Sequence, residues 1–340
     1  MLRRPFSTLA LVGAAWAAAP SVWAQAVVAD APSQAREVRA WLLRIHEASR
    51  QLNYEGTFVV SSTGAVASAR IAHYCQGRNQ FERSESLDGQ VRYIYRHNDE
   101  VRTLWPASKV ALIEKRTLLA SFPALLQAGD DHIADFYEIR RLKPERIAGH
   151  ESNVLLVKPR DAYRYGYRLW ADQGSGLLLR ADVLGEHHEI LESSAFSDVS
   201  IDVKPDLESV LQPMSKLDGY RVLHSALTPT RLDAEGWTLR QPPPGFRLVS
   251  CVKRPMDDAA GADVAGAELP AVQAIYSDGL TYVSVFIEPF DAQRHARPMT
   301  ASVGATQTLM QRLADSWVTV VGDVPLATLR RFVKGLERKP

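Results

Sequence analysis

Residues 163–183 read YRYGYRLWADQGSGLLLRADV, and the pattern of this segment predicts the fold class. Its side chains alternate, with Tyr163, Tyr165, Tyr167 and Leu169 on one side and Arg164, Gly166 and Arg168 on the other. A period of two is typical of a β-strand with one dry and one wet face. Gly174-Ser175-Gly176 then forms a turn, and the apolar run after it predicts a second, antiparallel strand.

The same pattern extends on both sides of this hairpin. Turn pairs such as Asp88-Gly89 and Asn98-Asp99 separate short β-rich runs. The expected strands are residues 54–61, 68–75, 80–86, 91–97, 100–105, 110–115, 136–142, 152–158, 163–171, 177–184 and 188–196. An amphipathic helix at 33–52 precedes them, with apolar residues at three- and four-residue steps. We expect a mostly β domain at 27–203, a curved antiparallel sheet or unclosed barrel with the helix on its concave face.

A smaller C-terminal α/β domain is expected at 223–340, after a linker at 204–222 that contains Pro205, Pro213 and Gly219. With 340 residues the chain is too long for one comfortable core. Strands are predicted at 237–240, 246–253, 271–276, 280–288 and 317–321, and helices at 306–316 and after Pro325.

The N-terminus has the pattern of a signal peptide covering residues 1–24. Arg3 and Arg4 precede an apolar stretch at 9–19 and a small-x-small cleavage site, Val22-Trp23-Ala24. The general secretory route is favoured, with twin-arginine export as the alternative. Since no cysteine follows the site, a lipid anchor is not expected, and in a Gram-negative bacterium the destination is the periplasm.

Charge and cysteine content exclude several classes of function. The 40 Lys and Arg residues nearly balance 39 Asp and Glu residues and form no cluster, so no nucleic-acid partner is expected. Cys75 and Cys251 are the two cysteines. In an oxidising compartment they could form a disulfide between the domains or remain two thiols. Neither has the spacing of a zinc site or of a redox CxxC motif, and no cofactor is implied.

The motifs that carry catalysis are missing, so we do not expect an enzyme. Residues 188–192, HEILE, differ by one letter from the zincin motif HExxH, but that motif requires a helix and this segment is predicted as a strand. The chain has no GxSxG, no P-loop and no GxGxxG after a strand. Asp130-Asp131-His132 is more consistent with a turn than with a metal site.

Two features suggest binding of an apolar ligand. Residues 118–128 are apolar and contain Pro123, which predicts either ordinary core cover or a movable lid over a cavity. Aromatic residues on the hairpins, such as Tyr93 and Tyr95, could line a cavity or a protein interface or simply pack inside the sheet.

The order of segments along the chain resembles the RseB/MucB family of periplasmic negative regulators of the envelope-stress sigma factor. The matching stretches are residues 52–55 (LNYE), 163–183, 243–246 (PPGF), 276–280 (YSDGL) and 318–325 (VTVVGDVP). They span both expected domains, and the specificity lies in their joint order. The resemblance implies an N-terminal domain like the lipoprotein-carrier fold, with an apolar cavity, and a smaller C-terminal α/β unit.

The resemblance also implies a function. The chain would bind the periplasmic domain of a transmembrane anti-sigma factor, shield it from regulated proteolysis, form homo-oligomers, and be released by lipopolysaccharide or by the acyl chains of mislocalised lipoprotein. If both ligands bind in incompatible states, each lowers the affinity for the other by the same factor. A periplasmic lipid or lipoprotein carrier is the alternative. Our hypothesis for the lipid cavity has Phe58, Val60, Ile71, Tyr93, Tyr95 and Leu104 as its lining and Phe122, Leu125 and Leu126 as its lid.

Overall fold

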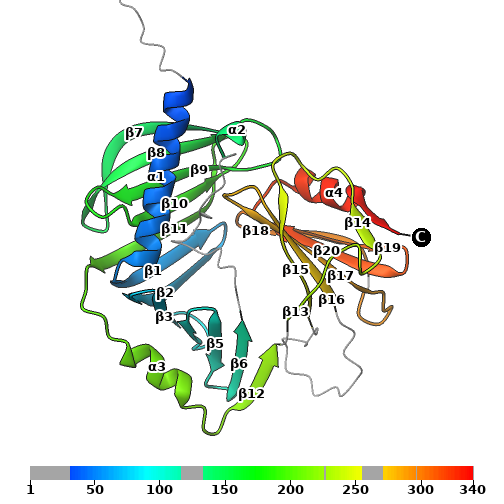
Figure 1. Cartoon of the computed structure of the whole chain (residues 1–340), viewed down its shortest axis with the longest axis horizontal. Helices are drawn as coiled ribbons and strands as arrows, with labels where there is room; N and C mark the ends of the chain where they lie inside the picture. The colour runs from blue at the N-terminus through cyan, green and yellow to red at the C-terminus, as the bar shows by residue number, and fades with distance from the viewer. Residues whose placement is uncertain (1–30, 116–132, 226, 255–270, 296, 340) are drawn as a thin grey trace, which may run out of the picture.

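The computed structural model describes residues 31–115, 133–225, 227–254, 271–295 and 297–339, and most of them form strands. The strands make two large sheets that lie beside each other, and the chain passes from one to the other once (Figure 1). The predicted mostly β class and the separate, smaller C-terminal sheet are confirmed. Within the described ranges no helix is both long and apolar enough to cross a membrane.

The first sheet has twelve strands in the order β12-β6-β5-β4-β3-β2-β1-β11-β10-β9-β8-β7. Its pairs are antiparallel except β12 with β6, which is parallel. Since β12 and β7 end the order without pairing to each other, the sheet is unclosed, as expected. The strands are β1 Tyr54–Ser62, β2 Ala65–Gln76, β3 Asn79–Ser86, β4 Tyr93–His97, β5 Glu100–Trp105, β6 Val110–Lys115, β7 Tyr137–Ile147, β8 His150–Pro159, β9 Gly166–Asp172, β10 Leu178–Leu184, β11 Ile190–Ile201 and β12 Arg221–Ser225.

Helix α1 (Ala31–Gln51) lies across one face of this sheet, which we call the inner face (Figure 1). Leu42 and Ile45 are buried there because they repeat at the spacing that keeps one side of a helix toward the sheet. They belong to the inner cluster, which consists of Leu42, Ile45, Ile133, Tyr137, Leu155, Val157, Tyr167, Leu169, Ala171, Leu178, Ala181 and Leu280. Short α2 (Ile133–Phe136) leads into β7 beside it.

The opposite, outer face carries α3 (Glu208–Ser215), within the segment expected as a linker. Val210 and Met214 are buried, and Arg102 donates a hydrogen bond to the carbonyl of Met214. They complete the outer cluster, which consists of Ala72, Tyr74, Phe81, Tyr95, Leu104, Ala111, Val210 and Met214. The expected domain boundary near Leu223 falls inside β12, which extends the first sheet. Residues 204–225 therefore pack on the N-terminal sheet before the chain leaves it.

The second sheet has seven strands in the order β13-β15-β16-β17-β20-β19-β18, and α4 (Leu326–Gly335) packs on it. Helix α4 begins after Pro325 as predicted, and Leu329, Phe332 and Val333 are buried in the core of this domain. The strands are β13 Thr228–Pro229, β15 Arg247–Arg254, β16 Ala271–Ser277, β17 Tyr282–Pro289, β18 Met299–Val303, β19 Thr306–Leu313 and β20 Ser316–Gly322. A separate pair joins β14 (Trp237–Leu239) to β21 (Leu336–Arg338).

The helix predicted at 306–316 is wrong, because residues 306–313 form β19 and β20 begins at Ser316. Its sequence, TQTLMQRL, contains good helix formers, but β19 pairs with β18 on one side and β20 on the other. Leu309 points into the core of the C-terminal domain. Ladder hydrogen bonds and packing override weak local propensity here. Ala314 has a φ of 56°, a left-handed conformation that an α-helix does not contain. It lies in the tight turn that joins β19 to β20.

The structure holds the two cysteines as free thiols. Cys75 lies in β2 and donates a hydrogen bond to the Arg50 carbonyl over 2.8 Å. Cys251 lies in β15, buried in the core of the other domain. The two strands belong to different sheets, and Cys75 is only partly buried.

Candidate functional site

Three of the nine proposed cavity residues, Phe58, Val60 and Ile71, lie on the inner face. Phe58 packs edge-on against Phe196, with 6.0 Å between ring centroids. Ile71 packs against the buried group that contains Phe196 and Ala48 of α1. These residues could contact an apolar ligand on the inner face.

Three others, Tyr93, Tyr95 and Leu104, lie on the outer face. In the β-ladder Tyr95 is opposite Arg83, and Arg83 is opposite Ala72, the neighbour of Ile71. Successive residues of a strand point to opposite faces, so the tyrosine and Ile71 lie on different sides of the sheet. Tyr95 and Leu104 are members of the outer cluster beneath α3, and Tyr93 packs against it.

The structure therefore does not bring these six residues into one cavity. Sequence alternation shows which residues of a strand share a face, but a sheet covered by helices on both sides has two apolar faces. The remaining three, Phe122, Leu125 and Leu126, lie outside the described residues.

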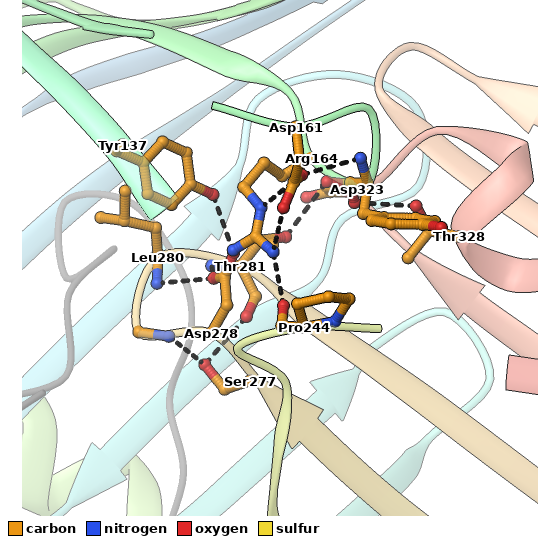
Figure 2. A network of polar contacts seen from close by, with 12 residues as sticks. Tyr137, Asp161, Arg164, Pro244, Ser277, Asp278, Leu280, Thr281, Asp323 and Thr328 are labelled. Atoms are coloured by element: carbon orange, nitrogen blue, oxygen red, sulfur yellow. Dashed lines mark hydrogen bonds and ion pairs between the residues drawn. The ribbon is translucent and has the colours of Figure 1, made fainter. Parts of the chain in front are cut away.

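The polar network with the most buried charge instead joins the two domains at Arg164 (Figure 2). This residue belongs to the connection from β8 to β9, because β9 begins at Gly166 and not at 163 as predicted. Its guanidinium donates from Nε and Nη2 to Asp161, over 2.9 and 3.0 Å. Nη1 donates to Oδ2 of Asp278 over 2.8 Å, and Nη2 donates to the Pro244 carbonyl over 2.5 Å. Arg164 thus binds acceptors of its own domain and of the C-terminal domain.

Asp278 is held in the turn between β16 and β17, residues 277–281. Its Oδ1 accepts hydrogen bonds from the Leu280 and Thr281 amides, each over 3.0 Å, and its Oδ2 accepts one from the Tyr137 hydroxyl over 2.9 Å. The side chains of Asp278 and Arg164 are both fully buried. Burial raises the pKa of the Asp278 carboxyl, and the guanidinium, the two amides and the hydroxyl oppose that shift. Burial is the largest of these effects, so the pKa of the carboxyl lies above its usual value although four donors point at it.

Leu280 extends this contact into the N-terminal domain. Although it belongs to the C-terminal domain, it is buried in the inner cluster with residues of α1, β8 and β9. Beside it the Thr281 hydroxyl donates to the Asp323 carbonyl over 3.1 Å, and it also contacts the Tyr167 hydroxyl. The turn thus inserts a carboxylate and an aliphatic side chain together into the neighbouring domain.

Two further regions hold the domains together. The Thr328 hydroxyl at the start of α4 donates to the Tyr163 carbonyl over 2.7 Å, and Arg331 donates to the Tyr163 hydroxyl over 3.0 Å. On the other side, the turn from β18 to β19 reaches β11, where a Cβ on Gly304 would lie 2.7 Å from a carboxylate oxygen of Glu192. Burial raises the pKa of Glu192, Asp323 adds to that rise, and a bond from the Ala305 amide opposes it.

A pocket of about 350 Å³ opens beside Arg164, at the ends of β8, β9 and β10. It reaches the inner cluster at Val157 and carries a cation at Lys158. Its lining is Leu156, Val157, Lys158, Pro159, Asp161, Ala162, Arg164, Gly166, Leu184, Gly185, Glu186 and His188. The pocket thus combines an apolar wall with charged side chains of both signs, among them Lys158 and Glu186.

Sequence reasoning missed this interface, although it used the residues that form it. The YSDGL stretch at 276–280 carries part of the family resemblance, and the alternation at 163–171 predicts Arg164 as one polar residue of a strand. An Asp-Gly pair with a leucine after it is an ordinary turn signal. No local sequence pattern predicts that such a turn packs into another domain.

Comparison with known proteins identifies the family. The model of the MucB/RseB N-terminal domain matches residues 37–214, and the model of the MucB/RseB C-terminal domain matches residues 231–337. The sigma factor AlgU regulatory protein MucB of Pseudomonas aeruginosa is 29% identical over 307 residues, which are 88% of this chain and 90% of MucB. The sigma-E factor regulatory protein RseB of Escherichia coli K12 is 25% identical over 299 residues, with 88% and 90% covered.

A solved structure shows the same architecture. The complex of Pseudomonas aeruginosa MucA and MucB includes a chain that superposes with a TM-score of 0.67 at 26% identity. The superposition covers 89% of this chain and 99% of that one. Since the two family models together match well over half of the sequence, in the expected order, this chain belongs to the MucB/RseB family of sigma factor regulatory proteins.

Proposed function

We propose that this chain is a periplasmic stress sensor that binds the periplasmic domain of a transmembrane anti-sigma factor and protects it from regulated proteolysis. The observation that carries the proposal is the match of both domains, in order, to the MucB/RseB models. It is supported by the fit to a MucB chain solved together with MucA. The role is binding and not catalysis, in keeping with relatives that are named as regulators.

Release by lipid is the second part of the proposal. An acyl chain from lipopolysaccharide or from mislocalised lipoprotein would bind the inner face and lower the affinity for the anti-sigma factor, and the anti-sigma factor would lower the affinity for lipid by the same factor. The apolar inner face beneath α1, including Phe58 and Ile71, supports this. Export with removal of residues 1–24, and assembly of several copies, belong to the same proposal.

A pull-down tests both parts. Mature protein, residues 25–340, is immobilised and mixed with the periplasmic segment of the anti-sigma factor from its own organism. We expect retention of that segment, and loss of retention when lipopolysaccharide is added. The matched control is the deacylated polysaccharide, which keeps the sugars and phosphates without the acyl chains and should leave the complex intact.

The other outcomes decide between functions. If the segment is not retained and lipid or lipoprotein copurifies with the protein, the carrier function replaces the sensor. If the segment is retained and lipopolysaccharide has no effect, the anti-sigma partner stands and release by lipid is rejected.

A further inference from the structure

The turn at 277–281 has the chemistry of an anionic amphiphile. Its carboxylate, on Asp278, contacts a buried guanidinium and a tyrosine hydroxyl, and two residues later Leu280 enters an apolar cluster. A fatty acid, or a lipid with a phosphate near its acyl chain, combines the same two groups. The N-terminal domain thus already holds an anion next to an aliphatic chain.

We propose that this seat, formed by Arg164, Tyr137 and the inner cluster around Leu280, is a binding site for an anionic acyl ligand, and that the 277–281 turn is its intramolecular competitor. The proposal rests on the sensor function above and adds to it the place where the acyl chain binds. A ligand carboxylate or phosphate would take the position of the Asp278 carboxylate, and its chain would take the position of Leu280.

Charge favours an anion in the seat. Arg164 is fully buried and shares its donors between Asp161, Pro244 and Asp278. Once Asp278 leaves, the Nη1 donor loses its acceptor, and an unsatisfied buried donor is costly. An anionic ligand restores that bond, whereas an uncharged chain does not.

The pocket beside Arg164 gives such a ligand a route. Its wall includes Val157, a member of the cluster that holds Leu280, and its rim includes Lys158. An amphiphile in this pocket would contact the exposed Lys158 first, and its chain would enter the inner cluster as the turn is displaced. Binding would then separate the turn from the N-terminal domain, which couples lipid entry to the contact between domains.

Hydrogen exchange of the full mature protein tests the site directly. The Leu280 and Thr281 amides donate to Asp278 inside the interface, so they should exchange slowly without ligand. We expect laurate, below its micelle concentration, to speed exchange of peptide 277–281 by about tenfold or more at saturation. Dodecanol has the chain without the charge and butyrate has the charge without a long chain, so both should leave the rate unchanged. The hairpin of β19 and β20 is the internal control.

Variants test the competition. Leu280→Ala should bind laurate about tenfold more tightly than wild type, because a weaker competitor leaves a larger fraction of seats open. Leu280→Met, of similar volume, should bind like wild type. Leu232→Ala, buried in the core of the C-terminal domain, controls for general destabilisation and should also leave laurate affinity unchanged.

Three results would overturn the inference. They are laurate binding without faster exchange at 277–281, equal laurate affinity of wild type and Leu280→Ala, and absence of laurate binding to both proteins. If any of these occurs while lipopolysaccharide still releases the anti-sigma segment, the site fails and the sensor function stands. If lipopolysaccharide releases nothing, the lipid part of the function fails with it.

Discussion

Arg164 and Asp278 form an ion pair that is closed to solvent and lies between two domains. Moving two charges out of water is expensive, and such a pair is stable only when its other hydrogen bonds are also made. Here Asp161, Pro244, Tyr137 and two backbone amides supply them. The pair therefore specifies how the domains meet more than it adds net stability.

Removal of one partner of this ion pair should strongly destabilise the protein. Arg164→Met leaves Asp278 buried without its cation, and we expect a loss of about 3–5 kcal/mol in the free energy of unfolding. Urea unfolding followed by tryptophan fluorescence measures this loss. The control is Arg231→Met, which breaks an exposed ion pair with Asp233 and should leave the urea midpoint near wild type. Equal midpoints for Arg164→Met and wild type would show that the pair is not closed in solution.

Glu192 should give the interface a pH dependence. Burial raises the pKa of its carboxyl in the folded protein, with Asp323 adding to the rise, so the folded state holds a proton more tightly than the unfolded chain. The free energy of unfolding should therefore decrease as pH rises from about 4.5, the usual glutamate range, through the raised value.

Glu192→Gln should remove that decrease and stabilise the protein at pH 7.5, by less than about 1 kcal/mol because the side chain is only half-buried. Melting temperatures at pH 5 and 7.5 compare the variant with wild type. Glu186→Gln, at an exposed position, should keep the wild-type pH dependence. A Glu192→Gln protein with the same pH dependence as wild type would contradict the assignment.

Among the elements, α3 shows how a segment without a strong pattern becomes part of a core. Its eight residues include Pro213, yet Val210 and Met214 point at the outer face of the sheet and are buried. Helices this short are marginal in water, so packing against the sheet stabilises this one. The parallel pairing of β12 with β6 then ties the following residues to the same sheet.

Met214→Ala should lower the free energy of unfolding by about 2–5 kcal/mol, because it leaves a cavity in the outer cluster. The control in the same helix is Gln212→Ala, whose side chain is exposed and whose loss should be nearly neutral. Chemical denaturation of the two variants makes the comparison. If Met214→Ala behaves like Gln212→Ala, α3 is not docked on the sheet in solution.

At the scale of the whole molecule, the two sheets are joined through contacts that involve both cores. Leu280 is part of the inner cluster, and Thr328 and Arg331 of α4 bind Tyr163. A domain whose core includes a residue of its neighbour should not unfold independently. The regulatory function proposed here uses this property, since a ligand in one domain changes the contact with the other.

Calorimetry tests this connection. Wild-type protein should unfold in one transition, whereas Leu280→Asp should show two, because an unpaired carboxylate in the inner cluster prevents docking of the turn. Leu232→Asp, which damages the C-terminal core and leaves the turn intact, should lower the melting temperature while the protein still unfolds in one transition. Two transitions in the wild-type protein would mean that the domains are energetically independent.

Much of this architecture could be predicted from the sequence because its causes are local. Alternating side chains predict strands, and the Asp-Gly and Gly-Ser-Gly sequences predict the turns between them. An apolar stripe at helical spacing predicts α1 and α4. The eleven strands expected in the first domain all occur, with ends that differ by a few residues. The helix wrongly expected in place of β19 shows where local sequence fails as a predictor, because pairing with β18 and β20 overrode the local helix propensity.

The mostly β class, the two domains and the likeness to the MucB/RseB family follow from the amino-acid sequence, because strand patterns and the order of family motifs are properties of the linear chain. The three-dimensional fold sets the face that each strand residue occupies, because Ile71 and Tyr95 are both hydrophobic and both faces of the sheet are covered. It alone also placed Asp278 against Arg164, which are 114 residues apart. Their pairing depends on how two independently patterned sheets dock, and a one-dimensional pattern carries no information about that contact.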